Sequence, residues 1–343
     1  YALHIARLKF KRHVYDATAD ELLKCASSTG TTTNPDLQHA IALSEKKFNK
    51  VSFQQATGKI SNFSDLKKRV DMAQHADTSR LLSIAGCSDS PKLQIGTELQ
   101  IDTSLHTDIG KFDKDTLGKF LITEMEHHFD ALGRYNNSFS GIIASSDTIP
   151  WLHIPKPKPE VQLAHVSANN DPQNLGRVKV VFNWECHYCE ETDWLRVLCP
   201  NAGSSKTVPA NRGFVFIPEI GDQVIIDFEN GDIDRPYVLG ALFHGQNALG
   251  GQSENHLKSI ITSSGHSIQF DDSETSLSIS IKDKNGNCIQ LDTLGKNIVI
   301  SAPETLSLKA KDILLDAADR VEINATHIKN NALENLTQYS KNM

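Results

Sequence analysis

The stretch that decides the fold of the last third of the chain is Asn297-Ile-Val-Ile-Ser-Ala-Pro-Glu-Thr-Leu-Ser-Leu308. It holds two apolar pairs, and in each pair one residue separates the two members, so both side chains lie on one face of a short strand. The pairs recur at steps of eight, seven, eight and seven residues, starting at Ile298, Leu306, Ile313 and Val321 and ending at the single Ile328. Earlier pairs are Ile268 with Phe270, Leu277 with Ile279, and Ile289 with Leu291. This internal repeat predicts a series of short strands, each with one apolar face.

Such strands need a surface that covers them, because each unit supplies only two aliphatic side chains and a turn. Stacking the units, or winding several chains around one axis, buries these side chains at about 1.5–3 kcal/mol each. An ordinary antiparallel meander packed on the preceding domain is the alternative. Asn285-Gly286, between Ile281 and Ile289, indicates a hairpin near the start of this region.

Composition restricts the class of protein. The 343 residues favour two or three domains. The sequence contains no run of about 18 apolar residues, which a membrane-spanning helix would need. The net charge of -7 argues against binding of nucleic acid through phosphate neutralisation. Six dispersed cysteines indicate synthesis in a reducing compartment. The chain starts at Tyr1 without a basic and apolar leader, and we expect that its true beginning is missing.

The first 148 residues predict a mixed α+β region. Thr18-Ala-Asp-Glu21 has the pattern of a capping box, which predicts a short helix over 19–27. Apolar residues at helical spacing predict a second helix over 64–82. Alternating residues around Val51 and Leu99, and over 119–129, predict half-buried strands.

Four prolines within residues 149–159 predict a stiff linker. Beyond it, β runs are separated by Gly, Pro, Asn and Asp, and no helical pattern intervenes. The runs are Gly176 to Phe182, Trp194 to Leu198, Gly213 to Phe216, Gln223 to Phe228 and Tyr237 to Phe243. So many strands in about 85 residues favour a small closed barrel of the OB type, since closure removes the sheet edges.

Three motifs invite a chemical interpretation. Cys186-His-Tyr-Cys189 has the spacing of half a zinc site, but no second Cys-x-x-Cys pair occurs, so a loop between barrel strands is favoured. Glu124-Met-Glu-His-His-Phe129 alternates as one wet face and one packed face of a strand would. Gly231-Asp-Ile-Asp-Arg-Pro236 lacks the spacing of a calcium loop and predicts a turn in which Arg235 pairs with a carboxylate.

The barrel region also carries motifs of one known family. They are Asn174-Leu-Gly-Arg-Val-Lys-Val-Val-Phe-Asn-Trp184, Trp194-Leu-Arg-Val197, Asn201-Ala-Gly203, Phe216-Ile-Pro-Glu-Ile-Gly-Asp-Gln-Val224 continuing to Pro236, and Leu239-Gly240. With them the chain resembles the VgrG proteins, the trimeric spikes of type VI secretion systems, which are similar to phage tail hub and spike proteins. Residues 64–101 and 119–142 resemble the later part of the hub region of that family. Glu219 departs from the family pattern, which favours Arg there, and we expect a different local salt bridge.

The resemblance implies a mainly β protein with an α+β N-terminal part. Its regions would be a hub-like region over 1–148 that lacks its first part, a Pro-rich linker over 149–160, an OB-fold barrel over 161–245, a linker over 246–260, an intertwined three-chain β-helix needle over 261–331 and a polar tail over 332–343. The apolar core of the trimer would be formed by Ile298, Ile300, Leu306, Leu308, Ile313, Leu315, Val321 and Ile323.

The same resemblance implies a cell-puncturing spike without catalytic residues, cofactor or metal. Its partners would be its own copies, a hexamer of an Hcp-like tube protein at the hub end, and a PAAR-like tip protein with effectors at the needle end. The tip protein would dock at Asn324, His327, Ile328, Asn330 and Asn331. The spike would assemble in the cytoplasm and be exported into target cells. A phage-like tail hub, an OB barrel that binds oligosaccharide or nucleic acid, and a peptidoglycan-cleaving enzyme are the alternatives; the last lacks a credible carboxylate pair.

Overall fold

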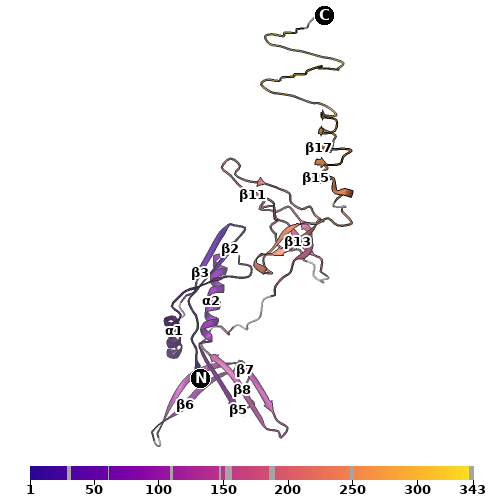
Figure 1. The fold of residues 1–343 in the computed structure, drawn as a ribbon. Coiled ribbons are helices and arrows are strands. Elements are labelled where there is room, and N and C mark those ends of the chain that lie inside the picture. The colour runs from indigo at the N-terminus through magenta and orange to yellow at the C-terminus, as the bar shows by residue number, and fades with distance from the viewer. Residues whose placement is uncertain are drawn as a thin grey trace. The chain divides into compact units, whose positions relative to one another are not determined.

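The computed structural model describes residues 1–28, 32–60, 62–108, 111–146, 148–150, 157–184, 190–247 and 251–339. In these ranges the protein is mainly β, as the sequence predicted, and the α-helices lie in its N-terminal part (Figure 1). The chain divides into two compact units, Tyr1–Asn247 and Ala248–Met343. None of the helices in the described ranges has both the length and the apolar character that crossing a bilayer requires. Residues 151–156 of the predicted Pro-rich linker lie outside the described residues.

The larger sheet of the N-terminal part has five antiparallel strands. Their order is β1 (Ala2–Leu3), β5 (Leu82–Ser88), β8 (Tyr135–Ile143), β7 (Lys111–Phe129) and β6 (Glu98–Asp108). One core joins this sheet to helix α1 (Pro35–Lys47), and it contains Leu37 and Ile41 of the helix together with Leu82 and Phe120 of the sheet. Phe120 is fully buried, and it is the largest of the buried side chains in this core.

Helix α1 was not predicted from the sequence, although its start carries a clear signal. Asn34 caps the helix, because its side-chain oxygen accepts a hydrogen bond of 3.0 Å from the amide of Leu37. Pro35 follows in the first turn, where its missing amide proton costs nothing.

The smaller sheet has the order β3 (Glu21–Ala26), β2 (Phe10–Asp16) and β4 (Ser52–Gln55). Helix α2 (Phe63–Ser79) packs on it through Leu66, Val70 and Ala73, which are buried. This helix confirms the helix predicted over 64–82, although it ends three residues earlier than predicted.

The helix predicted over 19–27 is wrong, because this segment forms a tight turn followed by strand β3. The carboxylate of Asp16 accepts hydrogen bonds from the amides of Thr18, at 2.9 Å, and Ala19, at 3.2 Å. Asp20 then adopts a positive φ of 56°, which reverses the chain. The amide of Thr18, which the side chain of Glu21 would accept from in a capping box, is thus used by an Asx turn that closes the β2–β3 hairpin.

The barrel is closed. Four antiparallel strands follow in the order β10 (Lys179–Phe182), β9 (Gln162–Ala168), β13 (Gln223–Phe228) and β14 (Pro236–Ala241). Residues 194–198 complete the ring. Leu195 exchanges two backbone hydrogen bonds with Val178, at 2.7 and 2.9 Å, and on the other side the amide of Val238 donates to the carbonyl of Arg196 at 2.9 Å. The inward residues form one core: Ala164, Val166, Val178, Val180, Leu195, Val224, Ile226, Phe228 and Val238.

A long excursion leaves the barrel after residue 198. Its regular pairing is confined to two short strands, β11 (Ala202–Gly203) and β12 (Arg212–Gly213). A strand was predicted from Gly213 to Phe216, but the observed strand β12 includes only Gly213 of that range. A one-turn helix, η1 (Glu229–Gly231), connects β13 to β14.

The second unit begins with η2 (Ser253–Asn255) and continues as an antiparallel meander. Its strands are β15 (Leu257–Ile261), β16 (Ser267–Asp271), β17 (Ser278–Lys282), β18 (Cys288–Asp292) and β19 (Asn297–Ser301), each paired with the next. The hairpin predicted at Asn285-Gly286 is confirmed, with Gly286 at a φ of 97°. Residues 302–339 form neither helix nor strand.

Two points differ from the sequence prediction of this unit. Residues 257–301 pair within one chain, whereas the prediction had three chains intertwined from residue 261. In β17 the apolar pair is Ile279 with Ile281 rather than Leu277 with Ile279, because Leu277 precedes the strand and its carbonyl accepts from Thr293 at 3.0 Å. Whether three chains associate beyond this meander stays a prediction, since one chain is present.

The core under α2 gives a first prediction. Leu66→Ala removes a side chain that is fully buried, and we expect it to destabilise the N-terminal unit by about 2–5 kcal/mol. Met72→Ala on the same helix is the control, because that side chain is 50% exposed. In thermal unfolding followed by circular dichroism, the midpoint temperature of the first unfolding transition should be well below that of the wild type for Leu66→Ala. For Met72→Ala it should stay close to that of the wild type. Equal transitions for the two variants would contradict this packing.

Candidate functional site

The meander of the second unit has one wholly aliphatic and aromatic surface across four of its strands. Two rows of directly paired residues cross the sheet, and their side chains are 38–71% exposed. One row is Ile260, Ile268, Ile281, Ile289 and Ile300, and the other is Phe270, Ile279, Leu291 and Ile298. On the opposite face, Ser259, Gln269, Ser280 and Gln290 form a polar row. The apolar face is therefore distinct, and the described residues of the second unit do not cover it.

The predicted trimer-core residues beyond β19 are also exposed. Leu306, Leu308, Ile313, Leu315, Val321 and Ile323 are 53–74% exposed, and every residue of 303–339 is exposed. The residues predicted to dock a tip protein, Asn324, His327, Ile328, Asn330 and Asn331, lie in the same extended segment. Asn324 donates a hydrogen bond of 2.8 Å to Glu322. A single chain does not bring these residues together, so both predictions stay predictions.

A buried ion pair fixes the loop between β9 and β10. The guanidinium of Arg177 donates to both carboxylate oxygens of Asp171, at 2.7 and 2.8 Å. The two side chains are 11% and 3% exposed, and the Asp171 carboxylate also accepts from the amides of Gln173 and Leu175 at 3.0 Å. Arg177 and these amides hold the pKa of Asp171 well below its ordinary value. Asn174 and Gly176, with φ of 55° and 69°, let the loop wrap around the carboxylate.

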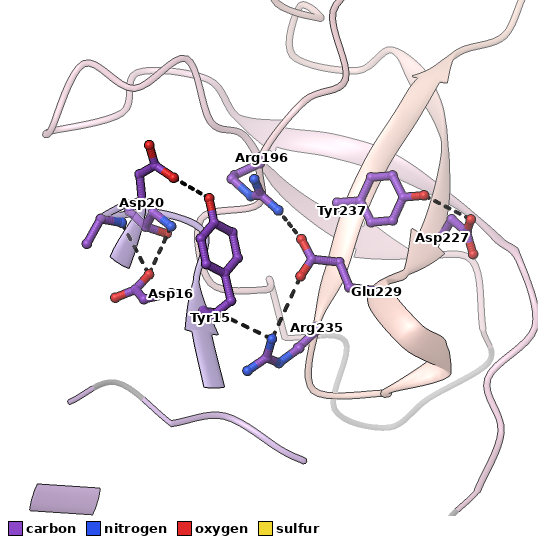
Figure 2. Close-up of polar contacts among 10 residues, drawn as sticks. Tyr15, Asp16, Asp20, Arg196, Asp227, Glu229, Arg235 and Tyr237 are labelled. Atoms are coloured by element: carbon purple, nitrogen blue, oxygen red, sulfur yellow. Dashed lines mark hydrogen bonds and ion pairs between the residues drawn. The ribbon is translucent and has the colours of Figure 1, made fainter. Parts of the chain in front are cut away.

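A second polar cluster surrounds Glu229 at the start of the turn between β13 and β14 (Figure 2). Arg196 donates to one of its carboxylate oxygens, and Arg235 lies 3.9 Å from the other. Arg235 also donates to the backbone carbonyl of Tyr15 at 3.4 Å. The prediction that Arg235 pairs with a carboxylate in this turn is confirmed.

Two more contacts join the barrel to the segment before α2. The amide of Gly58 donates to the carboxylate of Asp232 at 2.6 Å, and Lys59 forms an ion pair with Asp193. Lys59 lowers the pKa of Asp193, although both side chains are largely exposed and the pair contributes little stability. The contact of the N-terminal part with the barrel is thus mostly polar.

The other sequence candidates are not brought into a reactive arrangement. Cys186 and Cys189 lie outside the described residues. Near the end of β7, Glu124 accepts from Ser140 at 2.9 Å and His127 is 2.7 Å from the hydroxyl of Tyr135. The packed face predicted there is wrong, because Phe129 is 76% exposed at the tip of the hairpin. Across the described ranges, no three His, Cys, Asp or Glu side chains are placed to hold a metal ion.

Glu219 accepts a hydrogen bond of 3.2 Å from Asn169, where the family pattern would place an arginine. The backbone amide of Glu219 donates to Asp222 at 2.9 Å, so the turn is fixed by hydrogen bonds. The expected difference in the local salt bridge at this position stays a prediction.

Comparison with known families identifies the barrel. Residues 162–243 match the model of the Type VI secretion system/phage-baseplate injector OB domain. The matched range starts at the first residue of β9 and ends two residues after β14, so it covers the whole closed ring.

Among curated proteins, the actin cross-linking toxin VgrG1 of Vibrio cholerae is 33% identical over 123 residues, which are 33% of this chain and 10% of that protein. The type VI secretion system spike protein VgrG3 of the same species is 32% identical over 133 residues, 35% of this chain and 12% of its own length. VgrG1c of Pseudomonas aeruginosa is 36% identical over 77 residues, 22% of this chain and 10% of that protein.

The chain resembles the VgrG spike proteins. The family resemblance predicted from the sequence motifs is thereby confirmed. The matched segment spans about a tenth of the length of these VgrG proteins.

Solved structures that align with this chain include the lidded Francisella PdpA-VgrG complex, with a TM-score of 0.48 and 11% identity, covering 85% of this chain and 45% of that one. Another is the E. coli c3393 protein, described as a type VI secretion component similar to the T4 tail proteins gp27 and gp5. It aligns with a TM-score of 0.36 and 18% identity, covering 68% of this chain and 56% of that one.

Sequence reasoning missed the Asp171–Arg177 pair and the contact of Arg196 with Glu229. The first had a usable signal, since Asp171-Pro172 opens a loop that closes at Gly176-Arg177, directly before a β run. The second had none, because 33 residues separate Arg196 from Glu229 and only ring closure brings them together.

The buried pair of the VgrG-like barrel gives a pH-dependent prediction. The pKa of Asp171 is lower in the folded than in the unfolded chain, so its stabilising effect is present above about pH 4 and is lost as the pH falls further. We expect Asp171→Asn to destabilise the barrel by about 3–5 kcal/mol at pH 7, because it leaves Arg177 buried without a counter-charge. Urea unfolding at several pH values should show that the difference from the wild type narrows below pH 4. A difference independent of pH between 2 and 7 would exclude a contribution from the carboxylate charge.

Proposed function

We propose that this protein is a trimeric cell-puncturing spike at the tip of a contractile secretion tube. The single observation that carries the proposal is the uncovered apolar face of β15–β19, which continues as exposed aliphatic pairs through residue 323. Similarity of the barrel to an injector OB domain, and to VgrG spike proteins, supports the same function.

The apolar pairs explain why several copies are needed. Within its own chain, the segment after β19 has no strand partner among the described residues, and Leu306, Ile313 and Val321 are 53–57% exposed. Burial of one such side chain contributes about 1.5–3 kcal/mol. Three copies around one axis would cover the faces of one another, because each strand turns its apolar side inward and its polar side to water.

A shaft of this construction would act mechanically. Strands stacked at about 4.8 Å form a narrow rod, and each chain in it is held by the other two. Such a rod resists bending and local opening, so it would transmit the thrust of a contracting sheath to a small tip. The proposed role requires no catalytic group, in line with a similarity that covers a spike domain.

The proposed partners follow from the same role. The N-terminal part would face an Hcp-like hexameric tube, and the residues from Asn324 to Asn331 would seat a PAAR-like tip protein that carries effectors. Assembly would take place in the cytoplasm before export into the target cell. The spike names of the relatives support delivery as the function.

Two neighbouring residues test the trimer. Ile313→Asp would place three carboxylates on the axis, where burial of unpaired charge is prohibitive, and we expect loss of assembly. Leu314→Asp is the matched control, because Leu314 is 91% exposed and lies on the outward side of the same segment.

Light scattering of the full chain at micromolar concentration should give three times the monomer mass for the wild type and Leu314→Asp, and the monomer mass for Ile313→Asp. A monomeric wild type would overturn the proposal. Assembly of both variants alike would mean that the inward face has been assigned wrongly.

A further inference from the structure

The excursion from the barrel over residues 199–218, here called the arm, carries apolar side chains that its own barrel does not cover. All residues from 201 to 216 are exposed, and Phe214, Val215 and Phe216 are 51–60% exposed. The next residue, Ile217, packs against the barrel core and anchors the arm.

Three consecutive large apolar residues indicate a segment that is covered on both sides. Neighbouring side chains of an extended segment point in opposite directions, so a single supporting surface covers only one side. Phe214 and Val215 line a cavity of about 470 Å³ between the arm and the loop of Asp171. Phe216 does not line this cavity and is 56% exposed, so the cavity and the exposed ring both leave room for a covering surface.

The outer face of the same barrel has an apolar row of its own. Leu163 of β9 pairs with Ile225 of β13, and Ile225 pairs with Gly240 beside Leu239 of β14. Leu163 and Leu239 are 42% and 38% exposed, and Ile225 is half-buried. We name Leu163, Ile225 and Leu239 the barrel patch.

Charge favours contact of the arm with another barrel. The arm contains Lys206 and Arg212 and no carboxylate. The other residues of 162–243 include eleven Asp and Glu against four Lys and Arg. A positive arm would therefore be attracted to the negative barrel of a second copy, and this attraction adds to the hydrophobic contact.

The position of the arm on the ring suits a closed trimer. The arm leaves from residues 194–198, which pair with β14 and with the strand segment that precedes β10. Most of the barrel patch lies on β9 and β13, the two strands with which residues 194–198 form no bridge. Two different surfaces on separate sides of one subunit form a head-to-tail contact, which closes into a ring at a fixed number of copies.

We propose that the arm of each copy packs through Phe214 to Phe216 on the barrel patch of the neighbouring copy, and so locks the three barrels into a ring. This inference rests on the proposed trimer and assigns it a second interface, separate from the needle. The partner is a second copy of this chain.

Limited trypsin digestion of the assembled full chain tests the proposal, because Lys206 and Arg212 are the trypsin sites of the arm. In the wild-type trimer we expect slow cleavage at both. Phe216→Glu on the arm and Leu163→Glu on the patch should each speed this cleavage at least tenfold, while light scattering still gives a trimer held by the needle. Leu132→Glu is the control, because Leu132 is 74% exposed on the β7–β8 hairpin and should leave arm cleavage unchanged.

A charge swap separates contact from misfolding. Phe216→Glu alone should speed cleavage at Lys206 and Arg212, and combining it with Leu163→Lys should restore protection of these two sites, because the two charges would meet across the interface. Misfolded barrels would not recover in this way. A wild-type trimer whose arm is cut as fast as in Phe216→Glu, or a lack of rescue, would overturn the ring contact alone. A monomeric wild type would overturn the proposed function instead.

Discussion

A β-strand with one apolar face is stable only when that face is buried. The architecture of this protein depends on which surface buries the apolar face of each strand. In the barrel the sheet curls until residues 194–198 join its two edges, and the inward residues bury one another. In the N-terminal part helices α1 and α2 supply the cover. In the second unit neither solution is used, because the meander is open and no helix follows it in the described residues. Within the described residues of the second unit, the apolar face of β15–β19 is therefore left uncovered.

Polar contacts set positions where apolar burial does not. The Asp171–Arg177 pair holds a loop whose shape depends on two residues with positive φ, and it does so from inside the protein. The contacts of Glu229, Asp232 and Asp193 lie nearer the surface and connect the barrel with the N-terminal part. Buried and bidentate contacts fix geometry more firmly than exposed pairs do. Contacts within the barrel therefore fix its geometry more firmly than the contacts that connect it with the N-terminal part.

Local patterns predicted the elements that depend on neighbouring residues. Helix α2, strands β7 and β13, the barrel and the hairpin at Gly286 could all be read from periodicity and turn chemistry. Two predictions of secondary structure failed where one side chain accepts hydrogen bonds from backbone amides. Asp16 binds the amides after it, so the segment with the capping-box pattern forms a hairpin turn. Asn34 caps helix α1, which was not predicted because its apolar spacing is weak. The register of β17 depended on where the preceding turn ends, which spacing alone does not determine. The trimer-core and docking residues depend on other chains, so a single chain neither brings them together nor separates them.

Among the residues that the structure describes, strand β19 has a partner on one edge, β18, and none on the other. All hairpins before it close within the chain, so the alignment of those strands is settled before any second copy arrives. In the proposed trimer, the free edge of β19 would be the nucleus from which strands pair between copies. Growth from that nucleus would run in one direction, from Ser301 toward the C-terminus, so that the shaft zips up from a prealigned base and slipped pairings are avoided.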